Sequence, residues 1–330
     1  MYSDEDLDSA VTAGILSDDT AAAFRTHVAK LRRGPAVDEE HFRLVTGFND
    51  VFVAIACLLL LSSVGWIGAA VASWLGAAGV AGVAWILAEF FTRKRRMALP
   101  AIILLLAFVG GVLTAGFLVL PKATESFLVA GALAAFAARL HWLRFQVPIT
   151  VAAGAAAVVG CTVALLLSAI PEAKHWTTAI SLAAGIAVFL FAMHWDATDT
   201  ARQTRRSDVA FWLHLLAAPL IVHPVFTLLG VFEGRTTTAQ AAAVVLLYIA
   251  IAVVSLCIDR RALMVSALVY VLYTFSALLK QYGVVSLSFA ITALVIGSAL
   301  LLLSAFWHPC RAWTLKFVPP ALQRRLAPAR

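Results

Sequence analysis

Long apolar segments alternate with short polar connections through almost the whole of this 330-residue chain. The hydrocarbon core of a bilayer is about 30 Å thick, and roughly 20 apolar residues cross it as an α-helix. Lipid offers no hydrogen-bond partner to backbone amides and carbonyls, so such segments must be helical. We therefore expect an all-α, polytopic transmembrane bundle. Its spans, about ten in number, are predicted at residues 48–67, 70–92, 98–119, 125–143, 147–170, 175–195, 208–231, 237–258, 262–279 and 284–307.

The overall composition excludes a soluble protein. Hydrophobic residues make up 62% of the chain and charged residues 13%, whereas soluble domains have roughly 45–50% and about 25%. A soluble fold of this length could not cover so much apolar surface with polar groups. The lipid bilayer is therefore the expected partner. The net charge of +7 does not indicate nucleic acid, because the basic residues lie between the apolar segments.

Positively charged residues determine the predicted orientation. In the ten-span arrangement only four of the 25 Lys and Arg residues lie in connections on one side, and the other 21 lie on the opposite side. The four are Lys122, Lys174, Arg235 and Lys280. Cytoplasmic connections are enriched in Lys and Arg, so both termini are predicted in the cytoplasm. Abundant Ala and Arg are typical of bacteria with GC-rich genomes, and the expected location is the bacterial cytoplasmic (inner) membrane.

Most tryptophans fit the same spans, but Trp85 lies too deep in the second span. The indole ring favours the level of the lipid headgroups, where its apolar body and its N–H are both accommodated. Six tryptophans fall at predicted helix ends, where they are expected to meet headgroups: Trp66, Trp142, Trp176, Trp195, Trp212 and Trp307.

The sequence divides into three regions. Residues 1–47 are polar, and their capping residues predict a cytosolic helical hairpin and a linker: Ser17 before two aspartates starts a helix, and Gly14 ends one. Residues 48–307 form the predicted transmembrane domain, and 308–330 form a basic cytosolic tail. The hairpin is interpreted as a cap for the cytosolic face or as a docking module for a protein partner.

Two resemblances accompany this layout. The hairpin segment AGILSDDTAAAF, residues 13–24, followed by many spans resembles uncharacterised predicted bacterial membrane proteins that open in this way. Ten spans also divide into halves of similar length, 48–170 and 175–307. Because five is an odd number, the second half would have the opposite orientation in the membrane to the first. That topology is similar to the drug/metabolite transporter superfamily, whose members contain two five-helix inverted repeats. The resemblance implies a membrane transporter.

The seventh span contains the least ordinary apolar sequence, with His214, Pro219, His223 and Pro224 between residues 211 and 230. Each proline removes a helical hydrogen bond, and lipid tolerates the freed carbonyl only beside protein or a water-lined cavity. Interrupted helices of this kind form the central sites of many transporters. The alternative is that both prolines only kink the helix and each histidine bonds a neighbouring group. The candidate cavity or gate comprises these four residues and three tyrosines in later spans: Tyr248, Tyr270 and Tyr273.

A second candidate is a polar cluster at the cytosolic edge of the bundle, made of Asp50, Glu89, His194 and Asp208. Asp50 enters the first span and Glu89 leaves the second, so the two carboxylates are expected at similar depth. One interpretation is a clamp between carboxylates and arginines at the helix ends, and the other is an entry point for a proton or cation. The stretch from His194 to Asp208, with Asp196 and Asp199, is interpreted as a solvated interface.

Motifs of enzyme chemistry are missing from the sequence. There is no P-loop, HExxH or GxSxG motif, and the four cysteines form no CxxC pair. We therefore predict no catalytic residues, no cofactor and no metal site. The leading hypothesis is a permease or flippase-like transporter of a small neutral or amphiphilic solute. The rival is a membrane scaffold, sensor or assembly factor whose hairpin binds a partner. A cavity in mid-membrane beside Pro219 would favour transport.

Overall fold

The computed structural model describes residues 4–31, 48–120, 124–200, 202, 204–230, 237–281 and 288–328. Within these ranges the chain consists of helices and the turns between them, with no β-strand. The chain divides into two compact units, Met1–Arg43 and Leu44–Arg330, and each is described by itself.

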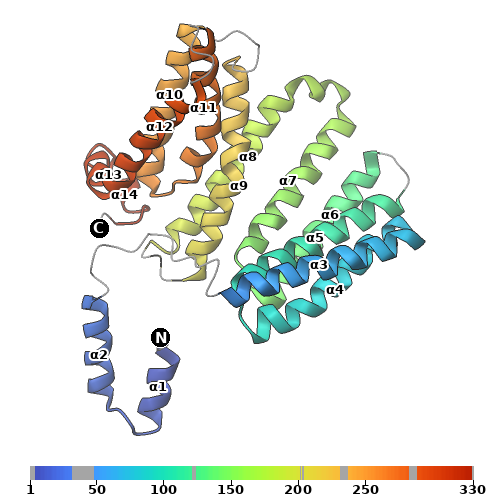
Figure 1. Ribbon diagram of the computed structural model, residues 1–330, viewed down its shortest axis with the longest axis vertical. Helices are drawn as coiled ribbons and strands as arrows, with labels where there is room; N and C mark the ends of the chain where they lie inside the picture. Colours follow the sequence, from blue (N-terminus) through green and yellow to red (C-terminus); the bar gives the residue numbers. More distant parts are fainter. Residues whose placement is uncertain are drawn as a thin grey trace. The chain divides into compact units, whose positions relative to one another are not determined.

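The first unit is a helical hairpin of α1 (Asp4–Thr12) and α2 (Asp18–Leu31), seen in blue in Figure 1. Gly14 adopts a positive φ of 69° at the end of α1, a conformation that glycine reaches without strain. The Ser17 hydroxyl accepts a hydrogen bond from the Thr20 amide at 3.2 Å, which caps α2. An ion pair of 2.6 Å between Asp8 and Arg25 joins the two helices.

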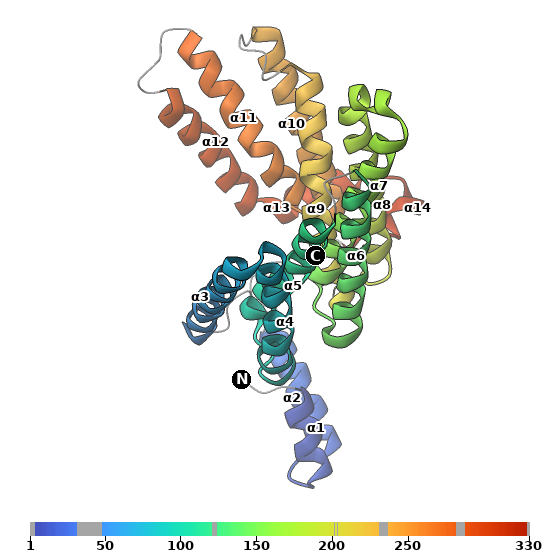
Figure 2. The same ribbon diagram turned by 90° about the vertical axis from the view of Figure 1, so that its right-hand side faces the viewer.

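The second unit contains ten long helices, and each of them coincides with one predicted span (Figures 1 and 2). They are α3 (Phe48–Val71), α4 (Ser73–Ala88), α5 (Ala98–Val119), α6 (Thr124–Phe145), α7 (Ile149–Ala169), α8 (Thr177–Ala197), α9 (Arg205–Leu228), α10 (Thr238–Ile258), α11 (Ala262–Gln281) and α12 (Ser288–Ala305). Shorter elements are η1 (Glu89–Lys94), η2 (Pro171–Trp176), α13 (Trp307–Leu315) and α14 (Pro320–Gln323). The all-helical prediction is thus confirmed for the described residues.

Eight of these helices, α3 to α10, are long and apolar enough to cross a bilayer. The count rises to nine if α12 and α13, which are bent by 71° at Phe306, form one span. The apolar part of α11, Ala262–Ala277, is shorter. The protein is therefore a multi-pass helical membrane protein. Helix length and apolarity together identify eight or nine spans among the described residues, which is fewer than the ten predicted.

Packing in the second unit follows chain order. Successive helices pair from α3 to α7, α8 pairs with α9, and α10, α11 and α12 pack beside one another. The helix α9 contacts α7, α8 and α11 and is the most buried of the spanning helices. The two halves do not repeat the same contacts: α4 and α5 pack closely, whereas α9 and α10 make few contacts among the described residues. The five-plus-five repeat stays a prediction.

Close approach of α3 and α4 depends on glycine at position 76. A Cβ there would collide with the Gly65 carbonyl oxygen and lie 2.8 Å from the Ala69 amide nitrogen, both backbone atoms of α3. A Cβ at Gly82, two turns further along the same helix, would meet nothing within 4 Å. We expect Gly76→Ala to lower the free energy of unfolding by about 1–3 kcal/mol through overpacking.

Gly82→Ala is the matched control and should cause no loss, because alanine favours the helix over glycine by up to about 1 kcal/mol. Thermal denaturation of both variants in the same detergent measures the difference. Equal midpoints for the two variants would show that the α3–α4 contact does not depend on Gly76.

Candidate functional site

The prolines of the seventh span do not interrupt its helix. The helix α9 is continuous from Arg205 to Leu228, with both Pro219 and Pro224 inside it. A Cβ at Gly185 of α8 would lie 2.8 Å from the Leu220 carbonyl carbon, so α8 covers the backbone that Pro224 leaves without a helical donor. The prediction of an interrupted helix is therefore wrong. Close helix packing protects this carbonyl, so no water-lined cavity is needed there.

The candidate cavity residues occupy different surroundings. His214 is buried and its Nε2 lies 2.8 Å from Asp196 Oδ2, at the end of α8. His223 is exposed on the bundle and its Nδ1 lies 2.8 Å from the Tyr270 hydroxyl of α11. Pro219 is also exposed, and Pro224 is buried. Of the three tyrosines, Tyr273 is exposed on α11 and Tyr248 lines a groove described below. Among these seven residues, the structure brings His223 and Tyr270 into contact.

The four residues predicted to form a cluster at the cytosolic edge also lie in different surroundings. Glu89 accepts hydrogen bonds from Arg144 at 2.6 and 3.0 Å, and Arg93 lies 3.3 Å away. Asp50 is buried in α3, His194 is exposed, and Asp208 is half-buried near the start of α9. Glu89 therefore joins η1 to α6 through arginines, which agrees with the interpretation of this residue as a clamp between a carboxylate and arginines.

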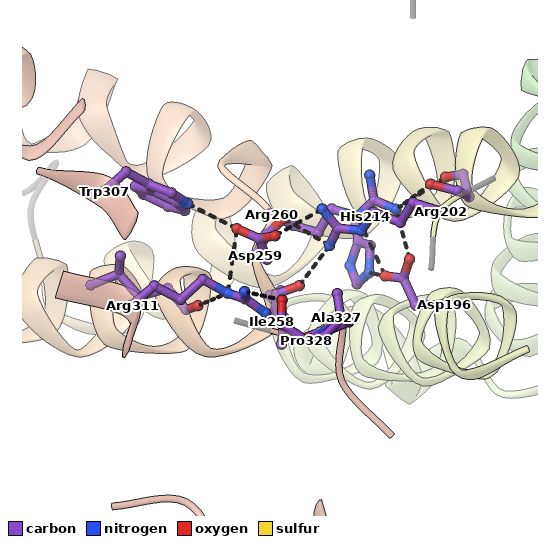
Figure 3. Close-up of polar contacts among 12 residues, drawn as sticks. Asp196, Arg202, His214, Ile258, Asp259, Arg260, Trp307, Arg311, Ala327 and Pro328 are labelled. Carbon is purple, nitrogen blue, oxygen red and sulfur yellow. Dashed lines mark hydrogen bonds and ion pairs between the residues drawn. The ribbon is translucent and has the colours of Figure 1, made fainter. Parts of the chain in front are cut away.

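A buried ion-pair network lies where α8, α9, α10, α11 and α13 end or begin (Figure 3). We use this name for Asp196, Arg202, Ser207, His214, Asp259, Arg260, Trp307 and Arg311. All of these side chains except Asp196 are less than a tenth exposed, and the Asp196 side chain is 12% exposed. Charges in such places are stable only when they are paired and hydrogen-bonded.

Asp259 is the first centre of the network. It caps the end of α10 in the left-handed conformation, with φ of 59°, and it lies between Trp307 and Arg202 (Figure 3). Arg202 donates to its Oδ2 at 3.0 Å, and the Trp307 indole N–H donates to its Oδ1 at 2.8 Å. Arg202 also donates to the main-chain oxygens of Ile258 and Asp259. Asp259 thereby fixes the α8–α9 connection and the start of α13 against the end of α10.

Asp196 is the second centre. Its carboxylate receives Arg260 Nη2 at 2.6 Å and contacts His214 at 2.8 Å. The same guanidinium nitrogen donates to the carbonyl and the hydroxyl oxygens of Ser207 at 3.1 and 3.2 Å. Arg260, the residue after Asp259, therefore joins α8 to the start of α9. Asp259 and Arg260 are adjacent in the short connection between α10 and α11, so this connection contributes a side chain to each centre.

Arg311 of α13 extends the network to the end of the chain. Its Nε donates to the Leu256 carbonyl at 3.2 Å and lies 3.4 Å from Asp259. Its two terminal nitrogens donate to the carbonyl oxygens of Pro328 and Ala327 at 2.9 and 2.5 Å. The described part of the basic tail is therefore held against α10 and α13.

Sequence reasoning missed this network. Asp196 and Asp199 were expected in a solvated interface, but Asp199 is 9% exposed and Asp196 is paired inside the network. Trp307 was expected to meet headgroups, and instead it is 2% exposed and bonded to Asp259. One signal was available: three consecutive charged residues, Asp259 to Arg261, form the entire connection between two apolar helices. So short a connection cannot carry all three side chains away from the bundle.

The polar contacts also relate the ends of the helices to one another. Each of four contacts joins two points of the chain that are separated by two apolar helices, so both points lie at the same end of that helix pair. The four are Glu89 with Arg144 around α5 and α6, Gln146 with Arg205 around α7 and α8, Asp196 with Arg260 around α9 and α10, and Asp259 with Trp307 around α11 and α12.

A partly open apolar groove of about 200 Å³ lies next to this network. We call it the Tyr248 groove, and its lining residues are Tyr248, Arg261, Met264, Val265, Leu268, Leu300, Leu303, Ser304 and Trp307. Met264, Val265 and Leu268 form one stripe along α11, and Leu300, Leu303 and Ser304 form one stripe along α12. Arg261 lies just before the first stripe, and Trp307 begins α13 just after the second. The Arg261 guanidinium stacks over the Trp307 ring at 4.8 Å.

The Tyr248 hydroxyl is the polar group that α10 contributes to the groove. It is buried and forms no hydrogen bond within the described part of the chain. An unsatisfied buried hydroxyl costs roughly 1–3 kcal/mol. A bound molecule that carries an acceptor would remove this cost.

No family model, curated protein or solved structure matches the sequence. Among the described residues, no group of three or more His, Cys, Asp or Glu side chains is placed to hold a metal ion.

Proposed function

We propose that this protein is a flippase-like permease of the bacterial cytoplasmic membrane, which moves a small amphiphilic solute through the Tyr248 groove. The observation that carries the proposal is a groove between membrane helices with an almost wholly apolar lining, a basic side chain and an unsatisfied hydroxyl. Such a combination accommodates a molecule with an apolar body and a polar end.

The size and lining of the groove favour an amphiphilic over a hydrophilic solute. Sites for drug-sized ligands enclose roughly 300–1,000 Å³, and this groove encloses about 200 Å³. A hydrophilic solute would leave most of its polar groups without partners against Met264, Val265 and Leu268. An apolar chain would contact apolar side chains along almost the whole lining.

The proposed topology has ten spans and both termini in the cytoplasm. The four contacts that each enclose a pair of helices support it, because they collect the basic connections at one end of the helices. Asp259 precedes α11, Trp307 follows α12, and the two residues are in contact. These two helices therefore either both cross the membrane or both turn back without crossing it. The segregation of 21 from four basic residues agrees with crossing.

Transport is tested by filling the groove. In liposomes reconstituted with the protein, we expect Leu300→Trp to reduce the transfer of a fluorescent single-chain amphiphile between leaflets by at least roughly tenfold, since about 1.4 kcal/mol of lost site binding corresponds to that factor. Leu301→Trp is the matched control, because Leu301 is 74% exposed on the outer face of the same helix. Equal rates for wild type, both variants and empty liposomes would contradict the proposal.

The topology predicts the position of reporter fusions. Fusions after Lys122, Lys174, Arg235 and Lys280 should give periplasmic activity, because few basic residues lie in these connections. Fusions after Arg96 and Arg206 should give cytoplasmic activity. Alkaline phosphatase and green fluorescent protein distinguish the two sides. Cytoplasmic activity at any two of the first four positions would contradict ten spans.

The second candidate function is a scaffold or assembly factor, and the separate hairpin unit favours it. Met1–Arg43 forms its own compact unit, and Ile15 is 76% exposed on it. Phe24 of the same unit is 38% exposed, and two exposed apolar side chains on one small unit are suited to a protein partner. Deletion of residues 1–33 distinguishes the candidates: a permease keeps its transfer rate in liposomes, whereas a scaffold has no transfer rate and loses its partner in cells.

A further inference from the structure

We infer that the Tyr248 groove binds an anionic phospholipid, with one hydrocarbon chain along the groove and the phosphate at Arg261. This inference deepens the proposed function, on which it rests for the role of the site, by naming the class of solute. Binding at equilibrium is measurable without transport, so the two proposals can fail separately.

The shape of the groove fits a single hydrocarbon chain. One wall extends from Arg261 along α11 to Leu268, and the opposite wall extends from Leu300 of α12 to Trp307 at the start of α13. Seven residues of α-helix rise by about 10 Å, so the α11 wall is about two turns long, and the opposite wall reaches from α12 to the 71° bend before Trp307. A groove of about 200 Å³ with this apolar lining accommodates part of one chain, and its open side lets the remainder of the lipid stay in the bilayer.

The polar end of the groove is cationic. Arg261 and Trp307 occupy the same end of the two walls, next to the buried ion-pair network. Stacking on the indole uses the flat face of the guanidinium, and its N–H donors lie in the plane of the group, where they match phosphate oxygens. Basic side chains at the ends of membrane helices attract anionic headgroups by about 1 kcal/mol each.

The Tyr248 hydroxyl adds a second point of recognition. The ester carbonyls of a glycerophospholipid lie between its phosphate and its chains, and they are the acceptors that such a lipid offers within the bilayer. A hydroxyl that is buried in the groove without a partner is suited to donate to one of them. The groove thus offers a cation for the headgroup, a donor for the ester and apolar walls for the chain.

Photo-crosslinking of the full-length protein in nanodiscs tests this inference. The probes are phosphatidylglycerol and phosphatidylcholine, each with a diazirine on one acyl chain, at trace amounts in phosphatidylcholine. We expect phosphatidylglycerol to label peptides of α11 and α12 roughly fivefold more than phosphatidylcholine, the ratio expected for one basic residue at the headgroup. This headgroup comparison uses the unchanged protein and depends on no variant.

Variants then assign the recognition to residues. Arg261→Gln should reduce labelling by phosphatidylglycerol to the level of phosphatidylcholine, and Leu300→Trp should abolish labelling by both. Arg206→Gln and Leu301→Trp are the matched controls, because both side chains are exposed, and neither should change the labelling. Tyr248→Phe should reduce labelling by both lipids to a similar extent.

Three results would overturn the inference: equal labelling by the two lipids in the unchanged protein, labelling unaffected by Leu300→Trp, or displacement of the lipid by millimolar inorganic phosphate. The last would assign the cation to a soluble phosphate compound. Selective labelling without transfer in liposomes would support the lipid site and contradict the permease. Transfer without selective labelling would support the permease and contradict the anionic lipid.

Discussion

Asp259→Asn should lower the free energy of unfolding by about 3–5 kcal/mol, the range for removing one partner of a buried ion pair. Asparagine keeps the size of the side chain and tolerates the left-handed conformation that residue 259 adopts. Its amide oxygen can still accept from the Trp307 indole. What is lost is the negative charge beside Arg202, 3.0 Å away, and Arg311, 3.4 Å away. Both arginines are at least nine-tenths buried, so water cannot replace the carboxylate.

Denaturation of the purified protein in one detergent measures this change. Glu172→Gln, an exposed carboxylate in η2, is the matched control and should shift the unfolding midpoint little. Adding Arg202→Gln to Asp259→Asn should recover part of the loss, because the pair of substitutions restores the balance of buried charge. A variant as stable as the Glu172→Gln control would show that water solvates the network and that its charges are not buried.

Arg260→Gln should cost about 3 kcal/mol, the lower part of the same range. The substitution removes the guanidinium that binds Asp196 at 2.6 Å and Ser207 at 3.1 Å. The Asp196 carboxylate keeps His214 and is 12% exposed, so it is partly compensated. Arg260→Lys should recover less than half of the loss, because the guanidinium binds Asp196 through both Nε and Nη2, and an ammonium group has only one nitrogen.

Arg261→Gln, the same substitution one residue later, is the control. It removes a stacking contact with Trp307, which is worth about 1 kcal/mol at a partly exposed site. The substitutions of the two neighbouring arginines should therefore have different effects. Arg260→Gln should mainly lower stability, and Arg261→Gln should mainly lower lipid labelling. Equal losses of stability at the two positions would contradict the assignment of Arg260 to a buried network.

Trp307 connects the network to the groove. Its indole N–H binds Asp259, its ring stacks on Arg261, and it forms one end of the groove wall. The position of that wall therefore depends on the buried charge at Asp259. Because the chain bends by 71° between α12 and α13, the start of α13 is set by this hydrogen bond and by Arg311.

The sequence by itself determined the class of the fold and the positions of the helices. Runs of about 20 apolar residues leave the backbone no partner except itself, so each becomes a helix, and all ten predicted segments coincide with α3 to α12. The count of spans depends on more than apolarity: α11 falls short by length, and whether α12 continues into α13 is decided at a bend. Hydrophobicity reports only local segments, so it does not decide these cases.

Tertiary structure alone decided which polar residues meet. His214 and His223 lie nine positions apart in one helix, yet one is buried on Asp196 of α8 and the other is exposed beside Tyr270 of α11. Likewise Arg260 and Arg261 are neighbours in the sequence, and one enters the network while the other lines the groove. Charge counting assigned both arginines to the cytosolic side because it registers only sign and position along the chain. The surroundings of a side chain are set by helices distant in sequence, which is the physical reason the network and the groove had to be seen in three dimensions.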